Sequence, residues 1–327
     1  MKPKHAKRPE APQRKAAAPA KPPVVERILA TTDFSDASRA GVRYALSLAK
    51  RIGASVELLH VVEPRSWASG MGSVLPARDD SAVVASARAR LAAMAARGTK
   101  SGVAVTGSVS VRPGNAFHAI ITAARERSVE LIVISTHGYT GLERVLLGST
   151  AERVVRHAPC PVLTVPGRLG RLPPFRLRKI LVPLDFSNLS MDALPYATLL
   201  AAKFGAEVTL LHVVEKFPID YLLGGGLLNE LFVPLMKQAE ADLEGIAQGL
   251  EAGAKLKVST AVREGSPYEE ICQAAKSLEA DLVVLTTHGH TGLKQFWLGS
   301  TAERVVRHSP CPVLSVRELD RRPLPIQ

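Results

Sequence analysis

The chain has 327 residues, 46% of them hydrophobic, and a formal net charge of +12. At roughly 150 residues per domain, this length indicates two globular domains. No run of about 18 uninterrupted apolar residues occurs, so no membrane span is expected. The three cysteines, Cys160, Cys272 and Cys311, lack metal-ligand spacing and require no oxidising compartment, and we expect a cytoplasmic protein. Cys160 and Cys311 each stand in a Pro-Cys-Pro sequence, and we expect buried structural thiols there, with a reactive or bridging thiol as the alternative.

The positive charge is concentrated at the N-terminus. Residues 1–23 contain seven Lys or Arg residues and one Glu, in an Ala/Pro/Lys-rich context without hydrophobic periodicity. Such a segment cannot bury enough apolar surface to fold, so a disordered basic tail is predicted. It either keeps the chain in solution or acts as an electrostatic arm for acidic partners. Because so much of the excess charge lies there, nucleic acid is not expected as a partner.

Strand and helix patterns alternate through the first half of the chain. Apolar runs predict strands over 24–31, 56–62, 103–111, 131–135 and 162–165, and helical periodicity predicts helices over 36–51, 79–98, 115–127 and 149–157. Short strand–helix–strand connections form right-handed parallel crossovers. The pattern therefore predicts a doubly wound, Rossmann-like α/β domain, a five-stranded parallel sheet in the order 3-2-1-4-5 with helices on both faces.

The second half repeats the first. Residues 131–165 and 282–316 are identical at 25 of 35 positions, and apolar runs recur at 179–187, 207–215, 255–262 and 282–287. Solenoid units recur every ~20–50 residues, so a repeat at this larger spacing is a whole domain. The predicted organisation is a tail at 1–23, a domain at 24–167, a linker at 168–177, a second domain at 178–318 and a C-terminal tail at 319–327.

One segment differs between the copies. Residues 217–233 are apolar and interrupted by three glycines, whereas the first copy is polar at this place. We expect this segment to pack at the interface between the domains, with binding of a partner or lipid as the alternative.

Two groups of residues in each copy are candidates for ligand binding. Open α/β sheets bind ligands beyond the carboxyl ends of their strands, at the switch point beside the first strand. Glycines let backbone N–H groups approach an anion, and the start of a helix suits phosphate. Ordinary helix capping is the alternative, but the recurrence of both groups in both copies favours a ligand site. The candidates are Thr31, Thr32, Asp33, Ser135, His137, Gly138, Gly148, Ser149 and Thr150, and Pro183, Leu184, Asp185, Thr286, His288, Gly289, Gly299, Ser300 and Thr301.

Roles follow from the chemistry of these side chains. Asp33 and Asp185 are expected to accept hydrogen bonds from ribose hydroxyls. His137 and His288 have no carboxylate at an obvious spacing, so structural hydrogen bonds in the turn are expected of them, and not general-base catalysis. Arginines in the last predicted helix of each copy are expected to contact either phosphate or the neighbouring domain, with a solvated helix face as the alternative.

With these motifs, both halves resemble universal stress protein domains, from about residue 25 to residue 317. The family's ATP signature, Gly-x2-Gly-x9-Gly-(Ser/Thr), is similar to Ser135-x2-Gly138-x9-Gly148-Ser149 and to Thr286-x2-Gly289-x9-Gly299-Ser300, with Ser135 and Thr286 in place of the first glycine. The resemblance implies bound ATP, or AMP or ADP, with the ribose on Asp33 and Asp185. It also places the backbone of Val61 and Val213 at the adenine edge.

The same resemblance implies how the halves associate. Family members dimerise through the last strand, so residues 162–165 and 313–316 are expected to pair within one chain, and a homodimer is a further expectation. Leu184 stands where the first copy has Thr32, so the first site is expected to bind nucleotide better. Any Mg²⁺ would be held mostly by the phosphates and water.

The predicted function is regulation of a stress response by nucleotide binding. The sequence has no GxxxxGK[ST] motif and no dense acidic metal site, which argues against a dedicated catalyst. Slow ATP hydrolysis and a nucleotide-free scaffold are the two alternatives.

Overall fold

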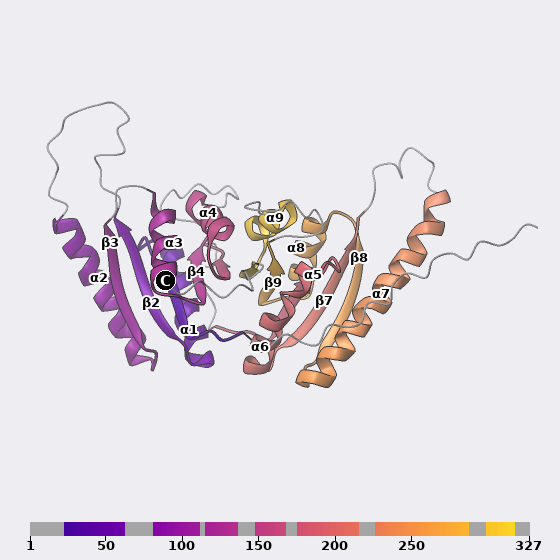
Figure 1. Cartoon of the computed structure of the whole chain (residues 1–327), viewed down its shortest axis with the longest axis horizontal. Coiled ribbons are helices and arrows are strands. Elements are labelled where there is room, and N and C mark those ends of the chain that lie inside the picture. Colours follow the sequence, from indigo (N-terminus) through magenta and orange to yellow (C-terminus); the bar gives the residue numbers. More distant parts are fainter. Residues whose placement is uncertain are drawn as a thin grey trace, which may run out of the picture.

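Ten strands form one continuous sheet. The computed structural model describes residues 23–62, 81–111, 115–136, 148–167, 175–215, 226–287 and 299–317. Within these ranges the strand order is β3-β2-β1-β4-β5-β10-β9-β6-β7-β8 (Figure 1). Each half contributes five parallel strands in the order 3-2-1-4-5, so the predicted fold is confirmed in both halves.

The elements of the first half agree closely with the sequence pattern. They are β1 (Arg27–Thr31), α1 (Asp36–Ile52), β2 (Ser55–Val62), α2 (Ser81–Lys100), β3 (Val105–Val111), α3 (Ala116–Glu126), β4 (Leu131–Ser135), α4 (Ser149–His157) and β5 (Val162–Val165). Helix α1 begins after Ser35, whose side chain accepts the N–H of Ser38, and ends at Gly53. The φ of 83° at Gly53 is a left-handed conformation that glycine adopts without a steric penalty.

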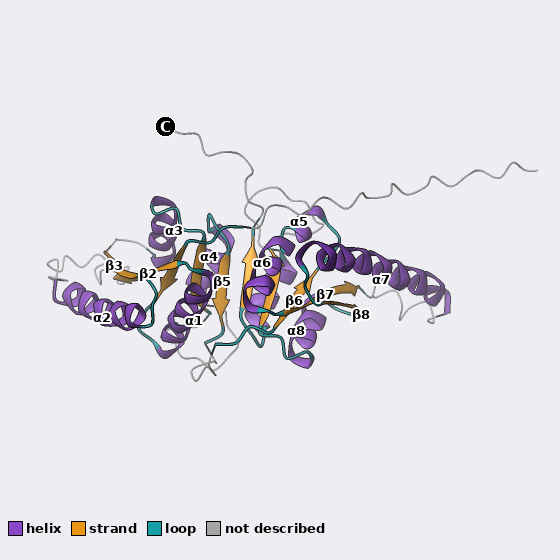
Figure 2. Cartoon of the chain, turned by 90° about the horizontal axis from the view of Figure 1, so that it is seen from below, coloured by secondary structure: helices purple, strands orange, loops and turns teal. Residues whose placement is uncertain are grey.

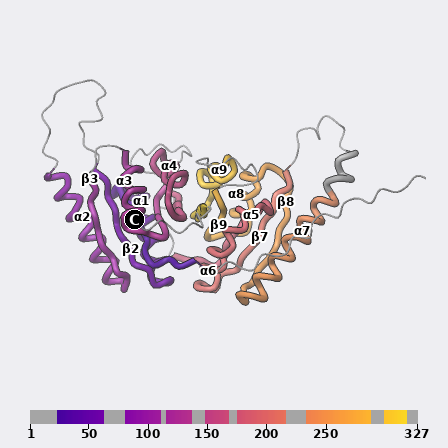
Figure 3. Tube along the Cα trace, viewed as in Figure 1, coloured from indigo at the N-terminus to yellow at the C-terminus, as the bar shows by residue number. Residues whose placement is uncertain are grey.

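The second half repeats this order with one interruption (Figure 3). Its elements are β6 (Lys179–Pro183), α5 (Asn188–Met191), α6 (Leu194–Phe204), β7 (Glu207–Val214), α7 (Gly226–Ala254), β8 (Val258–Glu264), α8 (Pro267–Ser277), β9 (Leu282–Thr286), α9 (Ser300–His308) and β10 (Val313–Val316). The counterpart of α1 is divided into α5 and α6. Pro195 lies in the first turn of α6, which fits the division, because proline lacks an N–H donor and is best tolerated in the first turn of a helix.

Helices cover both faces of the sheet (Figure 2). Helices α1, α2, α6 and α7 bury one core, which includes Leu48, Leu91, Leu200 and Leu243. Helices α3, α4, α8 and α9 bury the other. Each core contains residues of both halves, so the apolar interior is continuous across the molecule.

The halves join through their last strands. Strands β5 and β10 pair antiparallel, with Leu163 opposite Leu314, and the Thr164 hydroxyl donates to the Val313 carbonyl at 3.2 Å. The implied pairing of these strands inside one chain is therefore confirmed. Because parallel strands run within each half and antiparallel strands meet at the joint, the two halves are related by a pseudo-two-fold axis.

Helices α4 and α9 form a charged cluster across this joint. Arg156 lies 3.0 Å from Glu152 in its own helix and 3.8 Å from Glu303 in the other half. Arg307 repeats the arrangement, 2.8 Å from Glu303 and 3.9 Å from Glu152. Of the alternatives open for these two arginines, contact with the neighbouring domain is the one that the structure shows.

The opposite face of the joint is apolar and encloses a small cavity. Its volume is about 30 Å³, and its lining includes Tyr44 and Tyr196, which are equivalent residues of the two halves. Phe175, from the chain that connects the halves, contacts Tyr44 edge-to-face at 4.7 Å between ring centroids. The connecting chain therefore contributes to packing at the joint through its described residues.

Two sequence expectations concern peripheral segments. The described part of segment 217–233 opens α7, which packs on β7 and β8 at the far end of the sheet from the joint (Figure 1). The expectation that this segment packs between the domains is wrong for this part. The tails at 1–22 and 318–327 lie outside the described residues. Among the described helices, none has the length and apolarity that crossing a membrane requires.

Candidate functional site

The sheet opens at the carboxyl ends of β1 and β4. The ladder between these strands stops at the pair Ala30 and Val133. Beyond this point β1 stays paired with β2 as far as Thr31, and β4 stays paired with β5 as far as Ser135. Each strand therefore follows its other neighbour, and the ends of β1 and β4 are not paired with each other; we call the place between these two strand ends the crevice. This is the switch point at which α/β sheets bind ligands.

The second half opens in the same way. The ladder between β6 and β9 stops at Leu181 and Val283, whereas β6 follows β7 to Pro183 and β9 follows β10 to Thr286. The predicted residues at the strand ends thus border two equivalent crevices, one in each half.

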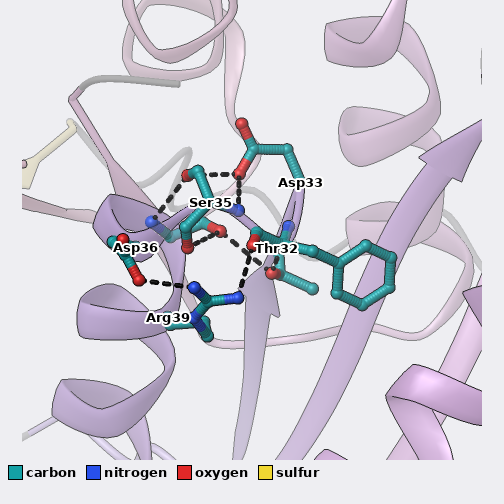
Figure 4. Close-up of polar contacts among 7 residues, drawn as sticks. Thr32, Asp33, Ser35, Asp36 and Arg39 are labelled. Carbon is teal, nitrogen blue, oxygen red and sulfur yellow. Dashed lines mark hydrogen bonds and ion pairs between the residues drawn. The ribbon is translucent and has the colours of Figure 1, made fainter. Parts of the chain in front are cut away.

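A hydrogen-bonded turn forms one wall of the first crevice (Figure 4). The Asp33 Oδ1 atom accepts the backbone N–H of Ser35 at 2.9 Å and its hydroxyl at 2.6 Å. The Thr32 hydroxyl accepts the N–H of Phe34 at 3.0 Å and lies 3.0 Å from the Ser38 hydroxyl. Thr32 is 5% exposed, so its side chain serves the turn, whereas one carboxylate oxygen of Asp33 points away from Ser35 in Figure 4.

Asp33 is held as a carboxylate. Half-burial acts to raise its pKa, but hydrogen bonds from Ser35 and Ser38 outweigh this effect, and the net pKa is lowered. Hydrogen bonds to the charged form of an acid favour that form. Asp33 is therefore an acceptor-only group at neutral pH, the form that suits sugar hydroxyls.

The turn holds its phenylalanine in a strained backbone conformation. Phe34 has φ of 65°, and its counterpart Phe186 has φ of 60°. Bulky residues rarely adopt this region, and such strain tends to occur at functional sites. Arg39 donates to the Phe34 carbonyl at 2.8 Å and forms an ion pair with Asp36, which stabilises the conformation (Figure 4).

A histidine supports the turn from the neighbouring strand. The Nδ1 atom of His60 lies 2.7 Å from the Thr32 carbonyl, and His212 makes the same contact with Leu184 at 2.8 Å. In the first half the His60 and Phe34 ring centroids lie 4.3 Å apart, and the Arg90 guanidinium lies 3.9 Å above the Phe34 ring. The sequence prediction missed this group as a unit, although Asp-Phe-Ser and the histidine both recur in the second copy.

The start of α4 forms the opposite wall. Gly148 precedes the helix and donates its N–H to the Thr136 carbonyl at 2.8 Å. Ser149 and Thr150 open the helix with partly or fully exposed side chains. The first N–H groups of a helix have no partner within it and carry partial positive charge. This wall therefore suits an anion, as the sequence predicted, and Gly299 with Ser300 and Thr301 repeats it in the second half.

The two sites differ at one position in the turn. Leu184 is 3% exposed and replaces Thr32, so the second turn has no side-chain hydroxyl at this place. Asp185 still accepts the N–H of Ser187 at 2.9 Å. The second site thus keeps the carboxylate, without the two contacts that the Thr32 hydroxyl makes in the first turn.

The remaining candidates are placed as follows. Val61 and Val213 lie near the carboxyl ends of β2 and β7 and are partly exposed. His137, Gly138, His288 and Gly289 lie outside the described residues. The structure therefore places the aspartate turn and the helix start at the carboxyl ends of neighbouring strands in each half, and the central part of each signature turn lies outside the described residues.

Two of the cysteines are buried, as expected. Burial raises the pKa of Cys160 and of Cys311 to about 12, which favours the protonated thiol at neutral pH. Within the described ranges, no three His, Cys, Asp or Glu side chains gather as ligands for a metal ion.

The architecture and the two crevices define a tandem doubly wound α/β protein with duplicated candidate ligand sites. The model of the universal stress protein family matches residues 25–166 and again residues 176–317. The chain therefore belongs to the universal stress protein family, as the sequence resemblance implied.

Relatives of known sequence or structure agree with this assignment. A universal stress protein of Mycolicibacterium smegmatis is 30% identical over 298 residues, which cover 89% of this chain and 96% of the relative. The crystal structure of a universal stress protein from Archaeoglobus fulgidus shares the fold with a TM-score of 0.66 at 23% identity, over 90% of this chain and 97% of that chain. A universal stress protein solved in complex with cAMP is 23% identical over 43% of this chain and 98% of its own, with a TM-score of 0.33.

Proposed function

We propose that this protein binds ATP at the crevice of each half and acts in the cytoplasm as a nucleotide-dependent regulator of a stress response. The observation that carries the proposal is the opening between β1 and β4, with an ionised carboxylate on one wall and a helix start on the other. The carboxylate suits sugar hydroxyls and the helix start suits phosphate, and a nucleoside phosphate carries these two groups at different ends.

The aspartate turn suits the sugar. Asp33 is ionised, half-buried and fixed by Ser35 through one oxygen, so its second oxygen is available in a set direction. A fixed carboxylate loses little side-chain entropy when it accepts hydrogen bonds from two neighbouring hydroxyls. We assign the ribose to this wall and the adenine edge to the backbone beside Val61.

The helix start suits the phosphates. Gly148 has no side chain, and the following N–H groups of Ser149 and Thr150 point out of the helix end. The Ser149 and Thr150 hydroxyls add donors. Any Mg²⁺ would be held by the phosphates and water, because the described residues offer no carboxylate cluster for it.

We assign a binding role, and not a catalytic one, to both crevices. Nδ1 of His60 contacts the Thr32 carbonyl and Oδ1 of Asp33 accepts from Ser35, so in our proposal both groups hold the turn in place and the second Asp33 oxygen meets the sugar. Bound nucleotide stabilises the conformation that binds it. In our proposal, the amount of this conformation is the signal of the regulator.

Isothermal titration of the full chain with ATP, AMP and cAMP tests the proposal directly. We expect ATP to bind and to raise the unfolding midpoint, with the strongest binding in the first half. Absence of binding heat and of thermal protection with every nucleotide would exclude it. Chromatography of the nucleotide after prolonged incubation separates a regulator, which returns ATP intact, from a slow hydrolase, which yields ADP.

A further inference from the structure

Helices α2 and α7 cover the two ends of the ten-stranded sheet (Figure 1). They are equivalent elements, because each packs on the two outermost strands of its own half. Buried Ala87 and Leu91 of α2 correspond to buried Ala239 and Leu243 of α7. Each exposed residue of α2 therefore has an equivalent position in α7.

The exposed surfaces of the two helices carry opposite charge. Helix α2 has no acidic residue and four exposed basic ones, Arg88, Arg90, Arg97 and Lys100; the guanidinium of Arg90 lies over the Phe34 ring, so the other three carry most of the outward charge. From residue 233 onward, α7 exposes one basic residue, Lys237, and four acidic ones, Glu240, Asp242, Glu244 and Glu251. By the correspondence above, Glu240 stands at the place of Arg88 and Asp242 at the place of Arg90.

Both surfaces also expose apolar side chains beside the charges. Val83 of α2 is 53% exposed, and Val233 and Leu235 of α7 are 52% and 56% exposed. Apart from Val24, these are the large hydrophobic residues most open to solvent in the described part of the chain. Exposed apolar side chains beside charges that are opposite to those of a partner are typical of an interaction surface.

The charge pattern selects one kind of self-contact. Two α2 surfaces, or two α7 surfaces, would bring like charges together, which costs free energy. An α2 surface against an α7 surface pairs opposite charges instead. We propose that the α2 surface of one chain binds the α7 surface of a second copy, head to tail. Because the two surfaces lie at opposite ends of the molecule (Figures 1 and 2), each contact leaves both outer ends free and the assembly stays open.

The association between copies should be observable only over a limited range of salt concentration. The whole chain carries +12, so copies repel one another at long range when the ionic strength is low. At about 0.1 M salt the Debye length is about 10 Å, which screens distant charges more than adjacent ones, whereas at about 1 M it is about 3 Å. Head-to-tail association should therefore be clear near 0.1 M salt and lost near 1 M.

Sedimentation equilibrium of the full chain over a range of concentrations tests the proposal. We expect the average mass at about 0.1 M salt to rise at least about twofold above the 35.0 kDa of one chain, and to return to it at about 1 M. Arg88→Glu/Arg97→Glu/Lys100→Glu leaves Arg90 against three Glu on α2 and so makes both ends acidic, and Glu240→Arg/Asp242→Arg leaves three basic against two acidic side chains on α7 and so makes both ends basic. Each variant alone should stay monomeric, and an equimolar mixture of the two should assemble again.

Two outcomes overturn the proposal. One is a wild-type chain that stays at 35.0 kDa at every salt concentration, and the other is a variant that assembles alone as well as the wild type does. A chain that lacks residues 1–22 is the control for the basic tail. If its removal abolishes assembly while the charge reversals do not, the cation that matters is the tail and not α2. Unchanged circular dichroism and unfolding midpoints confirm that the variants fold, as exposed positions predict.

Discussion

Gly148 donates its backbone N–H to the Thr136 carbonyl at 2.8 Å, and a Cβ on Gly148 would lie 3.1 Å from the same oxygen. Gly299 and Thr287 repeat both relationships, at 2.8 and 3.2 Å. The φ of Gly148 is −58°, which any residue adopts, so its backbone conformation does not require glycine. Glycine is favoured here because the residue lies so close to the Thr136 carbonyl at the end of β4. This is also the place where we propose that a phosphate lies.

Gly148→Ala should therefore weaken ATP binding more than it weakens the fold. The added Cβ crowds the Thr136 carbonyl and must shift the start of α4 by a few tenths of an ångström, which misaligns its N–H groups. We expect the dissociation constant to rise about tenfold, which corresponds to about 1.4 kcal/mol. Titration calorimetry measures it, and Gly299→Ala tests the second half in the same way.

Gly245→Ala on α7 is the matched control, because a Cβ there meets no atom within 4 Å. It should leave binding unchanged and stabilise the helix by up to about 1 kcal/mol. Equal ATP affinity in Gly148→Ala and the wild type would contradict the assignment of phosphate to this turn.

Ser35→Ala should make the first turn less stable, by an amount that depends on pH. Ser35 donates to Asp33 and caps α1, so its loss should cost about 1–2 kcal/mol at neutral pH. The lowered pKa of Asp33 gives stability that is present above its unfolded value of 3.8 and is lost as pH falls through the folded value. The difference between wild type and variant should therefore shrink below about pH 3.8.

Urea unfolding at pH 7 and at pH 3 measures this change. Asn115→Ala removes the cap of α3 without touching a carboxylate, so its cost should be the same at both pH values. A Ser35→Ala cost that is also independent of pH would show that the serine acts only as a cap.

Arg156 and Glu303 should be energetically coupled across the joint. They lie 3.8 Å apart in different halves, and both side chains are about 30% exposed, so solvent screens the pair. A double-mutant cycle with alanine should give a coupling of roughly 0.3–1 kcal/mol that declines as salt is added. Arg27 and Glu130, a pair at 3.0 Å within the first half, provide the reference cycle. Zero coupling for Arg156 and Glu303 would mean that this ion pair adds nothing to the joint, which then depends on the pairing of β5 with β10 and on apolar packing.

Much of this architecture could be predicted from the sequence, because local patterns determine it. The ranges of β4, α4 and β5 agree residue for residue, since apolar runs, a glycine start and a proline after the helix mark them. Because the second half repeats the first, the strand order predicted for the first half applies to the second as well. Placing Asp33 and Gly148 at one crevice followed from topology, because all strands of a parallel sheet end on the same side.

Other features depend on contacts that no local pattern encodes. The φ of 65° at Phe34 comes from hydrogen bonds with Thr32 and Arg39, and phenylalanine itself does not favour it. The position of segment 217–233 was predicted wrongly for its described part because apolar composition does not say which apolar surface it meets. Contact between Arg156 and Glu303 arises only when β5 pairs with β10, which places two identical helices side by side.

Tyr44→Phe should leave the protein as stable as the wild type or more stable. Tyr44 is 6% exposed, and its hydroxyl has no hydrogen-bond partner within the described residues. A buried polar group without a partner costs about 1–3 kcal/mol, and phenylalanine keeps the edge-to-face contact with Phe175. We expect the free energy of unfolding in urea to be unchanged or to rise by about 1 kcal/mol.

Tyr44→Ala separates the ring from its hydroxyl. It removes the contact with Phe175 and enlarges the cavity at the joint, so it should cost about 3–5 kcal/mol. A Tyr44→Phe chain that loses 1 kcal/mol or more would show instead that the hydroxyl is satisfied, by a water in the cavity or by part of the chain outside the described ranges. The two variants together decide whether Tyr44 stabilises the joint between the halves through apolar packing of its ring or through a hydrogen bond from its hydroxyl.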